Sequence, residues 1–132
     1  MTISEDDRKN LVNYRIGQSR QAVEDIKFLI EHKKFSIAVN RIYYGIFYAL
    51  SALAIKHEFN TSKHQQLIGW FNKNFVNEGL IDANISAIVH KAFSKRSKSD
   101  YAVFTEFKLE EVTEMFEEMK CFLTAIEKII FK

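Results

Sequence analysis

The chain of 132 residues has no proline, four glycines and a single cysteine. Proline and glycine are the residues that most often interrupt helices, so their scarcity favours long helices with few connections. The lone Cys121 excludes a disulfide within one chain and fits a reducing compartment. The formal net charge is only +2, which excludes a generally basic nucleic-acid-binding protein and requires any basic patch to be local.

The sequence also lacks the patterns of exported and membrane-spanning proteins. Its first ten residues, MTISEDDRKN, are polar and acidic rather than apolar. The longest apolar stretch, residues 42–55, contains Gly45 and Ser51 and is too short for a membrane span, so it predicts a buried helix. We therefore expect a cytoplasmic protein without membrane association. The length predicts one domain over residues 1–132.

What the sequence does contain is apolar residues at helical spacing. Five helices are expected, with Ser4 as the N-cap of the first and Asn77 to Gly79 as the turn that follows the third. Helices of this length with short links predict an all-α antiparallel bundle. The expected ranges are about 4–32, 36–57, 63–75, 82–97 and 109–131.

The second expected helix has two unlike faces. One face is large and aromatic, and the other is made of small residues. Small residues at this spacing let a neighbouring helix approach closely, either within one chain or between two copies of it. The large face consists of Tyr44, Phe47, Tyr48 and Ile55, and the small face of Ala38, Gly45, Ala49 and Ala52.

The segment HKAFSKRSKSDY, residues 90–101, carries most of the candidate chemistry. Arg96 continues the apolar stripe of its helix, where a guanidinium is costly unless it is paired. It could bind an anion such as phosphate, or form a structural ion pair with a carboxylate of the first or fifth helix. A separate stripe of lysines is either a solvated face or a phosphate-binding ridge. This stripe is Lys91, Lys95 and Lys98.

Two further residues stand on apolar or aromatic faces. His64 is either a structural histidine or a functional one. Arg41 precedes Tyr44 and Tyr48 by three and seven residues, so it could stack on their rings, pair with a carboxylate or contact phosphate.

Familiar metal and nucleophile signatures are missing. The residues three positions before the four histidines are Leu29, Ala54, Thr61 and Ala87, so no Glu-x-x-His pair of a di-iron bundle exists. There is no Cys-x-x-Cys, no glycine-rich phosphate loop and no local Ser-His-Asp signature. We expect no metal and no cofactor, although a site assembled from distant residues is not excluded.

Three segments together resemble the HEPN family of small helical bundles. AVNRIYYGIFYA, residues 38–49, resembles the Arg-x-Tyr-Tyr helix of that family. SKHQQLI, residues 62–68, with Phe71 and then FVNEGLI, residues 75–81, resembles a stretch of one HEPN branch. RSKSDY, residues 96–101, is similar to that branch's R-x-x-x-D-Y motif. With the last amphipathic helix, the resemblance covers roughly residues 8–130.

The resemblance implies a homodimer in which the Arg motifs of two subunits meet in a cleft. Many members are metal-independent ribonucleases with Arg followed, after four to six residues, by His. Many are encoded beside a minimal nucleotidyltransferase and act with it as a toxin–antitoxin pair, and others bind nucleotides. In this chain the positions expected for His hold Tyr101, Ala102 and Val103. Tyrosine titrates near pH ~10 and is a poor base at neutral pH.

Three hypotheses follow. In the first, the chain is a metal-independent endoribonuclease or toxin-like subunit with Arg96, Asp100, Tyr101 and His64 at its site. In the second, the same cleft is a non-catalytic module that binds RNA, nucleotide or a partner protein. In the third, Arg96 is a buried structural ion pair and the bundle has no such site.

Overall fold

The computed structural model describes residues 3–101 and 106–132, and for residues 96–101 it describes the backbone alone. The described chain forms five α-helices and no strand, which confirms the predicted all-α bundle. A π-helical turn, η1, continues the third helix over Asn72–Val76. The helices are α1 (Glu5–Glu31), α2 (Phe35–Lys56), α3 (His64–Phe71), α4 (Ala83–Tyr101) and α5 (Leu109–Ile130).

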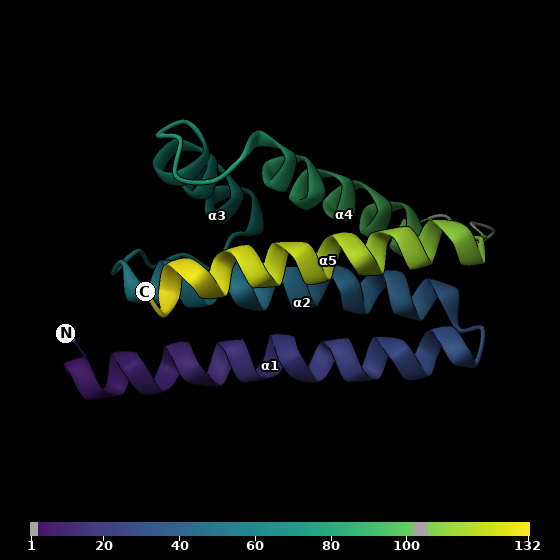
Figure 1. Cartoon of the computed structure of the whole chain (residues 1–132), viewed down its shortest axis with the longest axis horizontal. Coiled ribbons are helices and arrows are strands. Elements are labelled where there is room, and N and C mark those ends of the chain that lie inside the picture. Colours follow the sequence, from purple (N-terminus) through teal and green to yellow (C-terminus); the bar gives the residue numbers. More distant parts are fainter. Residues whose placement is uncertain (1–2, 102–105) are drawn as a thin grey trace.

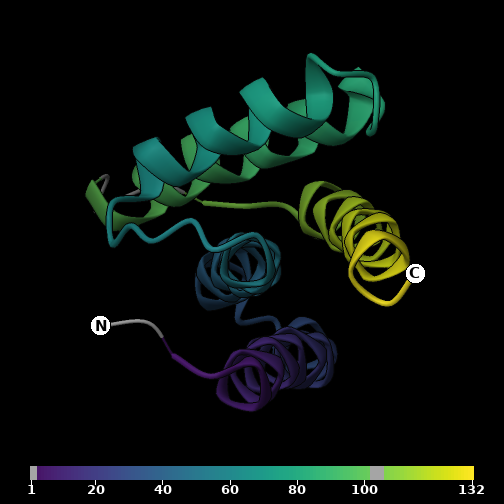
Figure 2. The same ribbon diagram turned by 90° about the vertical axis from the view of Figure 1, so that its left-hand side faces the viewer.

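Helix α2 is the centre of the bundle and packs against α1, α3, α4 and α5. Seen end-on, α1 lies on one side of α2, α5 lies beside it, and α3 and α4 form a layer on the side opposite α1 (Figure 2). Consecutive long helices run antiparallel, as predicted for α1 and α2 and for α4 and α5 (Figure 1). Helices α2 and α5 run in the same direction (Figure 1).

Individual residues near the helix ends determine where several of the helices begin or stop. The Ser4 side chain accepts a hydrogen bond from the Asp7 backbone N–H at 3.0 Å, which confirms the predicted N-cap of α1. Gly79 has a φ of +75°, and its N–H donates to the Val76 carbonyl at 3.0 Å. Glycine adopts this left-handed conformation without the steric cost that a Cβ imposes, so the predicted turn is also confirmed.

Two helix ends differ from the sequence prediction. Helix α4 continues to Tyr101, four residues beyond the predicted end at position 97. No glycine or proline stands there to stop it. The third helix was predicted as one α-helix to Phe75, whereas its last turn widens into η1 after Phe71. Asn72 at this widening accepts a hydrogen bond from Ser86 Oγ at 2.7 Å, which ties η1 to α4.

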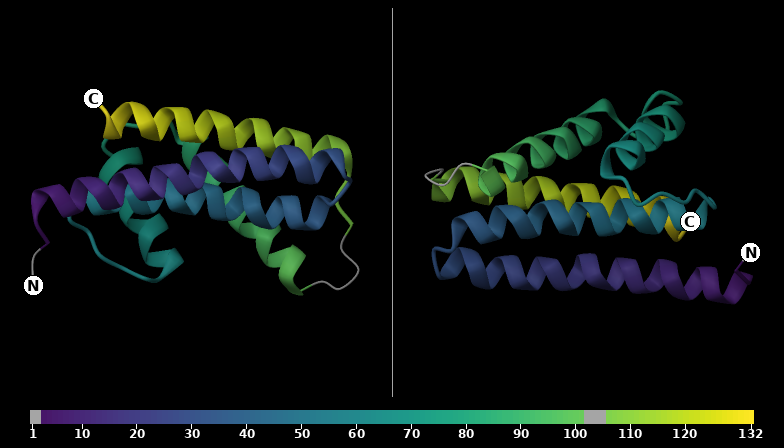
Figure 3. Two further views of the ribbon diagram at one scale, coloured as in Figure 1. Left: turned by 90° about the horizontal axis from the view of Figure 1, so that it is seen from below. Right: turned by 180° about the vertical axis from the view of Figure 1, so that it is seen from behind.

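The apolar stretch of residues 42–55 lies inside α2, as a buried helix should. By length and composition α2 is long and apolar enough to cross a membrane, but 61% of its most apolar window is buried inside the bundle. Helices α1 and α5 run along α2 (Figure 3), and both pack against it. This is the arrangement of a core helix.

The small face of α2 packs within the chain. Ala38, Ala49 and Ala52 are fully buried. A Cβ built on Gly45 would collide with Met119 Cε of α5 and lie 3.2 Å from Ala22 Cβ of α1. The small face therefore lets α1 and α5 approach α2 closely, and of the two interpretations left by the sequence the structure supports packing inside one chain.

We expect Gly45→Ala to lower the free energy of unfolding by up to about 2 kcal/mol. Overpacking against the buried Met119 and Ala22 costs about 1–3 kcal/mol, and the helix propensity of alanine offsets about 1 kcal/mol of it. Urea unfolding would measure the change. Gly17→Ala in α1 is the matched control, since nothing lies within 4 Å of its Cβ position. There the helix propensity of alanine should raise stability by about 0.5–1 kcal/mol. Equal effects at the two sites would contradict the packing argument.

Candidate functional site

His64 sits in a cluster of aromatic rings drawn from three helices. Its Nδ1 forms a hydrogen bond with the hydroxyl of Tyr43. Its ring centroid lies 3.8 Å from that of Phe47 and 6.3 Å from that of Tyr44. The Tyr43 ring in turn meets Phe93 of α4 edge-on, with centroids 5.9 Å apart. We call these five residues the His64 cluster: His64, Tyr43, Tyr44, Phe47 and Phe93.

The local sequence explains how the cluster forms. Tyr43, Tyr44 and Phe47 stand at helical spacing on the side of α2 that faces α3 and α4. His64 is the first residue of α3, and the connection after α2 brings it back over that side. Tyr43 is only 2% exposed, whereas His64, Tyr44 and Phe47 are half-buried. The cluster therefore joins the core to the surface.

Arg41 extends the aromatic surface along α2. Its guanidinium carbon lies 5.5 Å from the centroid of the Tyr44 ring, and Nη2 donates a long hydrogen bond of 3.5 Å to the Tyr48 hydroxyl. The predicted stacking on aromatic rings is therefore confirmed. A role of Arg41 in binding phosphate stays a prediction.

Helix α4 carries the Arg96 segment past the same cluster. Arg96 follows Phe93 by three residues, and the backbone of the helix is unbroken between them. The side chains of Arg96, Lys98, Asp100 and Tyr101 lie outside the described part of the chain. Their predicted roles thus stay predictions, and what the structure adds is the position of their helix beside His64.

The other two lysines of the predicted ridge lie against α5. Lys91 Nζ is 3.0 Å from Glu118 Oε1 and 3.7 Å from Glu114 Oε1. Lys95 Nζ is 2.8 Å from Glu111 Oε2. We call these three contacts the α4–α5 ladder. Lys91 and Lys95 are therefore ion-paired rather than a bare solvated face. Their role in binding phosphate stays a prediction, in which phosphate would compete with these carboxylates.

The ladder shifts the pKa of two of its residues, Glu111 and Lys91. The hydrogen bond from Lys95 lowers the pKa of Glu111, and it outweighs burial, which acts in the opposite direction. Burial opposes the charge of Lys91, yet hydrogen bonding and attraction to Glu118, with Glu114 adding to both, raise its pKa. The ladder thus favours the charged forms of Glu111 and Lys91.

His57, at the end of α2, gives the bundle a separate dependence on pH. Burial, and then the charge of Lys56, lower the pKa of His57 below its ordinary 6.5. Its ring packs against Phe75 and Trp70, with centroids 5.3 and 6.3 Å away. A lowered pKa means that the unfolded chain binds the proton more readily than the folded chain as the pH falls below 6.5.

We therefore expect the free energy of unfolding to fall as pH drops from about 7 through the folded pKa of His57. Urea titrations of the wild type and of His57→Gln between pH 7 and pH 5 would measure it. The variant should show the shallower decline. An equal slope in both proteins would mean that His57 does not contribute.

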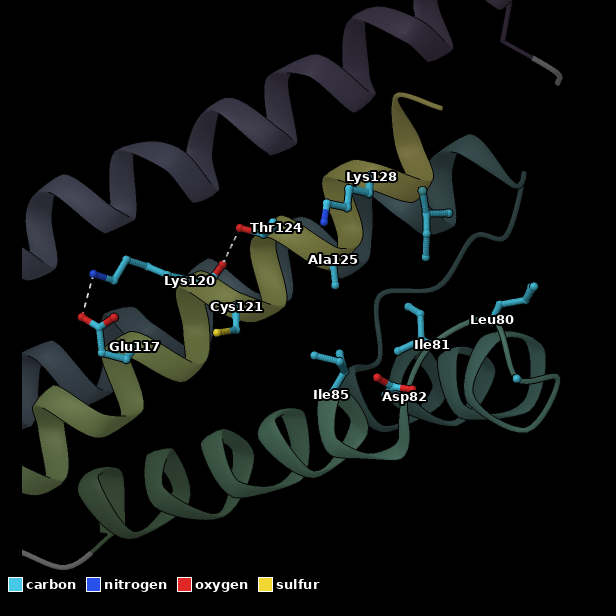
Figure 4. Close-up of a pocket in the computed structure, with 12 residues that line it drawn as sticks. Leu80, Ile81, Asp82, Ile85, Glu117, Lys120, Cys121, Thr124, Ala125 and Lys128 are labelled. Carbon is cyan, nitrogen blue, oxygen red and sulfur yellow. Dashed lines mark hydrogen bonds and ion pairs between the residues drawn. The ribbon is translucent and has the colours of Figure 1, made fainter.

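A pocket of about 610 Å³ lies away from the His64 cluster, between α5 and the start of α4. Figure 4 shows Cys121 and Ala125 of α5 facing Ile81, Asp82 and Ile85 across it. None of its lining residues belongs to the cluster. Within the described residues no group of three or more His, Cys, Asp or Glu side chains is placed to hold a metal ion.

A family model described as "HEPN domain" matches residues 12–129. The chain belongs to the HEPN domain family. Among similar HEPN relatives is a "UPF0332 protein" of Thermotoga maritima, 32% identical over 94% of each chain. Another is "Putative toxin MJ0605" of Methanocaldococcus jannaschii, 33% identical over 92% of this chain and 96% of the relative. A second protein of that organism, "Putative toxin MJ0142", is 28% identical over 87% of this chain and 78% of its own.

Sequence reasoning found His64 and missed the residue that holds it. Tyr43 was noted only as part of a family motif, and it lies 21 positions before His64 in the sequence. No periodicity links a residue of one helix to the first residue of the next. The acidic partners of Lys91 and Lys95 did leave a signal, because Glu111, Glu114 and Glu118 recur on one face of the last helix.

Proposed function

We propose that this HEPN chain is the toxin-like subunit of a toxin–antitoxin pair and binds RNA or nucleotide beside the His64 cluster. The observation that carries the proposal is that a half-buried histidine, held by Tyr43, shares a ring cluster with Phe93 of α4, the helix in which Arg96 follows three residues later. An arginine offers a planar fork of donors to phosphate, and the aromatic rings offer surfaces on which bases stack. The names of the two Methanocaldococcus relatives support the toxin context.

In this proposal the chain acts in the cytoplasm as a homodimer of single-domain subunits. Two copies bring their Arg96 segments to one cleft, and a minimal nucleotidyltransferase is the partner that controls the pair. Measurement of the solution mass tests the first part, and co-purification with the product of an adjacent nucleotidyltransferase gene tests the second. A protein that binds RNA as a monomer would contradict the shared cleft.

Cleavage and binding without cleavage are the two forms that the activity could take. Arg96 and His64 favour metal-independent cleavage, since one stabilises phosphate charge and the other donates or accepts a proton. Tyr101 at a position where nucleases of the family have His favours a non-catalytic module that binds RNA, nucleotide or protein. Missing an acid–base group typically costs about 10²–10⁴-fold in rate.

The deciding experiment is incubation of the purified protein with RNA in the presence of a chelator. Turnover without metal supports the endoribonuclease. Binding that weakens steeply with salt, without turnover, supports the binding module, because such binding releases counterions from phosphates. Neither turnover nor binding of RNA or nucleotides would overturn the proposal and leave Arg96 as a structural residue.

A further inference from the structure

A separate pocket of about 510 Å³ lies between the start of α1, the end of α2 and the residues that follow α2. Half of its lining residues are apolar, and the others include two arginines. None of them belongs to the His64 cluster. We call it the α1 pocket, and it is lined by Ile3, Arg8, Leu11, Arg15, Ile55, Glu58, Phe59 and Asn60.

The two arginines of the α1 pocket differ in how their charge is balanced. Arg8 Nη2 lies 3.1 Å from Glu58 Oε1, and Arg8 Nη1 lies 3.7 Å from Glu5 Oε1. Arg15 forms no ion pair within the described residues, and its Nη1 donates to the side-chain oxygen of Gln18 at 2.8 Å. Its Nε is buried and has no hydrogen-bond partner in the same part of the chain. Arg15 is therefore a cation that the described chain leaves without a counter-charge.

Arg15 and its surroundings favour a partner that is both anionic and apolar. A half-buried guanidinium without a carboxylate is costly, and a carboxylate beside it would form a charge-assisted hydrogen bond that offsets the cost. Ile3 and Leu11 in the pocket are each 41% exposed. Tyr14, whose ring centroid lies 6.0 Å from the Arg15 guanidinium carbon, is 61% exposed. Exposed apolar side chains grouped around an arginine are typical of protein–protein interfaces.

The chemistry of the α1 pocket favours a peptide over a nucleic acid. The carboxylates of Glu58 and Glu5 repel a phosphate backbone that passes along this part of α1. The aromatic ring of the lining, Phe59, is stacked on Trp70 with centroids 5.0 Å apart, so one of its two faces is already occupied. The other apolar lining residues are aliphatic and offer no ring on which a base could stack.

We infer that the α1 pocket is a docking site for a segment of a partner protein that carries a carboxylate next to an aliphatic side chain. The carboxylate pairs with Arg15, and the aliphatic side chain packs against Leu11 and Ile55. No residue of α4 lines the pocket, so the inference stands apart from the proposed function and from the cleft that it describes.

Selection from a phage-displayed library of short random peptides would test the inference with the whole chain as the target. Phage that bind Arg15→Glu would be removed first. We expect the peptides that then bind the wild type to share Asp or Glu beside Leu, Ile or Val. Enrichment of no peptide, or of peptides without an acidic residue, would overturn the inference.

Fluorescence anisotropy with a selected peptide would measure the contribution of each side chain. Arg15→Glu should bind at least about tenfold more weakly, since it sets like charges against each other. Leu11→Ala should bind about tenfold more weakly through lost apolar contact. Lys9→Glu is the matched control, because it makes the same charge change on α1 at a residue that does not line the pocket. It should change binding less than about threefold, and an equal loss in Lys9→Glu and Arg15→Glu would contradict the pairing.

A charge swap separates direct pairing from damage to the fold. The same peptide with lysine in place of its acidic residue should bind Arg15→Glu more tightly than it binds the wild type. A swapped peptide that binds both proteins equally would count against contact between the two charges. Thermal unfolding of each variant shows whether it is folded under the assay conditions.

Two further results would assign the α1 pocket to another occupant and overturn the inference. A change of solution mass in Arg15→Glu would mean that the pocket contacts a second copy of the chain. Displacement of the peptide by short single-stranded RNA, with an equal loss of RNA binding in Arg15→Glu, would place the pocket in an RNA site. Wild-type protein that binds the peptide but no RNA or nucleotide would overturn the proposed function and support the inference.

Discussion

The Arg96→Ala protein is expected to cleave RNA about 10²–10³-fold more slowly than the wild type, if the wild type cleaves. A fixed donor aimed at the charge that develops on a transferring phosphate typically contributes that much. If the protein only binds RNA, the same change should weaken binding by about tenfold or more, because it removes a charge-assisted contact to phosphate. Single-turnover cleavage and fluorescence-detected binding would measure the two effects.

Lys95→Ala is the matched control for Arg96→Ala. It removes one positive charge from the adjacent position of α4, yet Lys95 is paired with Glu111 rather than open to a ligand. We expect cleavage and binding to change less than about threefold, and stability to fall by about 0–1 kcal/mol as for other partly exposed ion pairs. Unchanged activity in Arg96→Ala, or an equal loss in both variants, would show that Arg96 has no special role.

The second large effect is expected in the core. Phe122 of α5 is fully buried and meets Phe71 of α3 edge-on, with ring centroids 6.1 Å apart. Phe122→Ala should lower the free energy of unfolding by about 3–5 kcal/mol, through lost burial and the cavity left between the helices. That is a large share of the roughly 5–15 kcal/mol by which a domain is stable. Urea unfolding monitored by circular dichroism would measure it.

Phe131→Ala is the control for this change. Phe131 has the same side chain, is 51% exposed and lies just beyond the end of α5. Its removal should alter stability by no more than about 0.5 kcal/mol. A loss at Phe122 as small as the loss at Phe131 would mean that the contact between α5 and α3 adds little to the stability of the fold.

The features that sequence predicted well are those that depend on neighbouring residues. The Ser4 cap needs only Asp7, three residues on, and the Gly79 turn needs only the carbonyl of Val76. The predicted stripe of α1 is Val12, Ile16, Val23, Ile26 and Ile30. Val12, Ile16 and Ile26 are buried and the other two are half-buried, because spacing along one helix decides which face meets the core. Such features involve at most a few helical turns.

The features that sequence could not predict depend on pairing between helices. The Tyr43–His64 hydrogen bond requires the path of the connection between α2 and α3, which no pattern encodes. The predicted end of α4 at position 97 was wrong, since Ser97, Ser99 and Asp100 favour a helix end without enforcing one. To predict that Lys91 and Lys95 lie against α5, one would need the angle between α4 and α5, which the sequence does not give. The candidate site was therefore predicted as a set of residues and not as an arrangement.

The α4–α5 ladder also affects how a salt titration of RNA binding should be interpreted. Added salt weakens ion pairs that are partly open to solvent, and the side chains of Lys91, Lys95 and Glu118 are about a third exposed or less. The same ions compete with the protein for phosphate. The steepness of the titration would then count both the phosphates contacted and the loosening of α4 from α5. A variant without the α4–α5 ladder would separate these two contributions. In that variant, the dependence of RNA binding on salt would report only the number of phosphates bound.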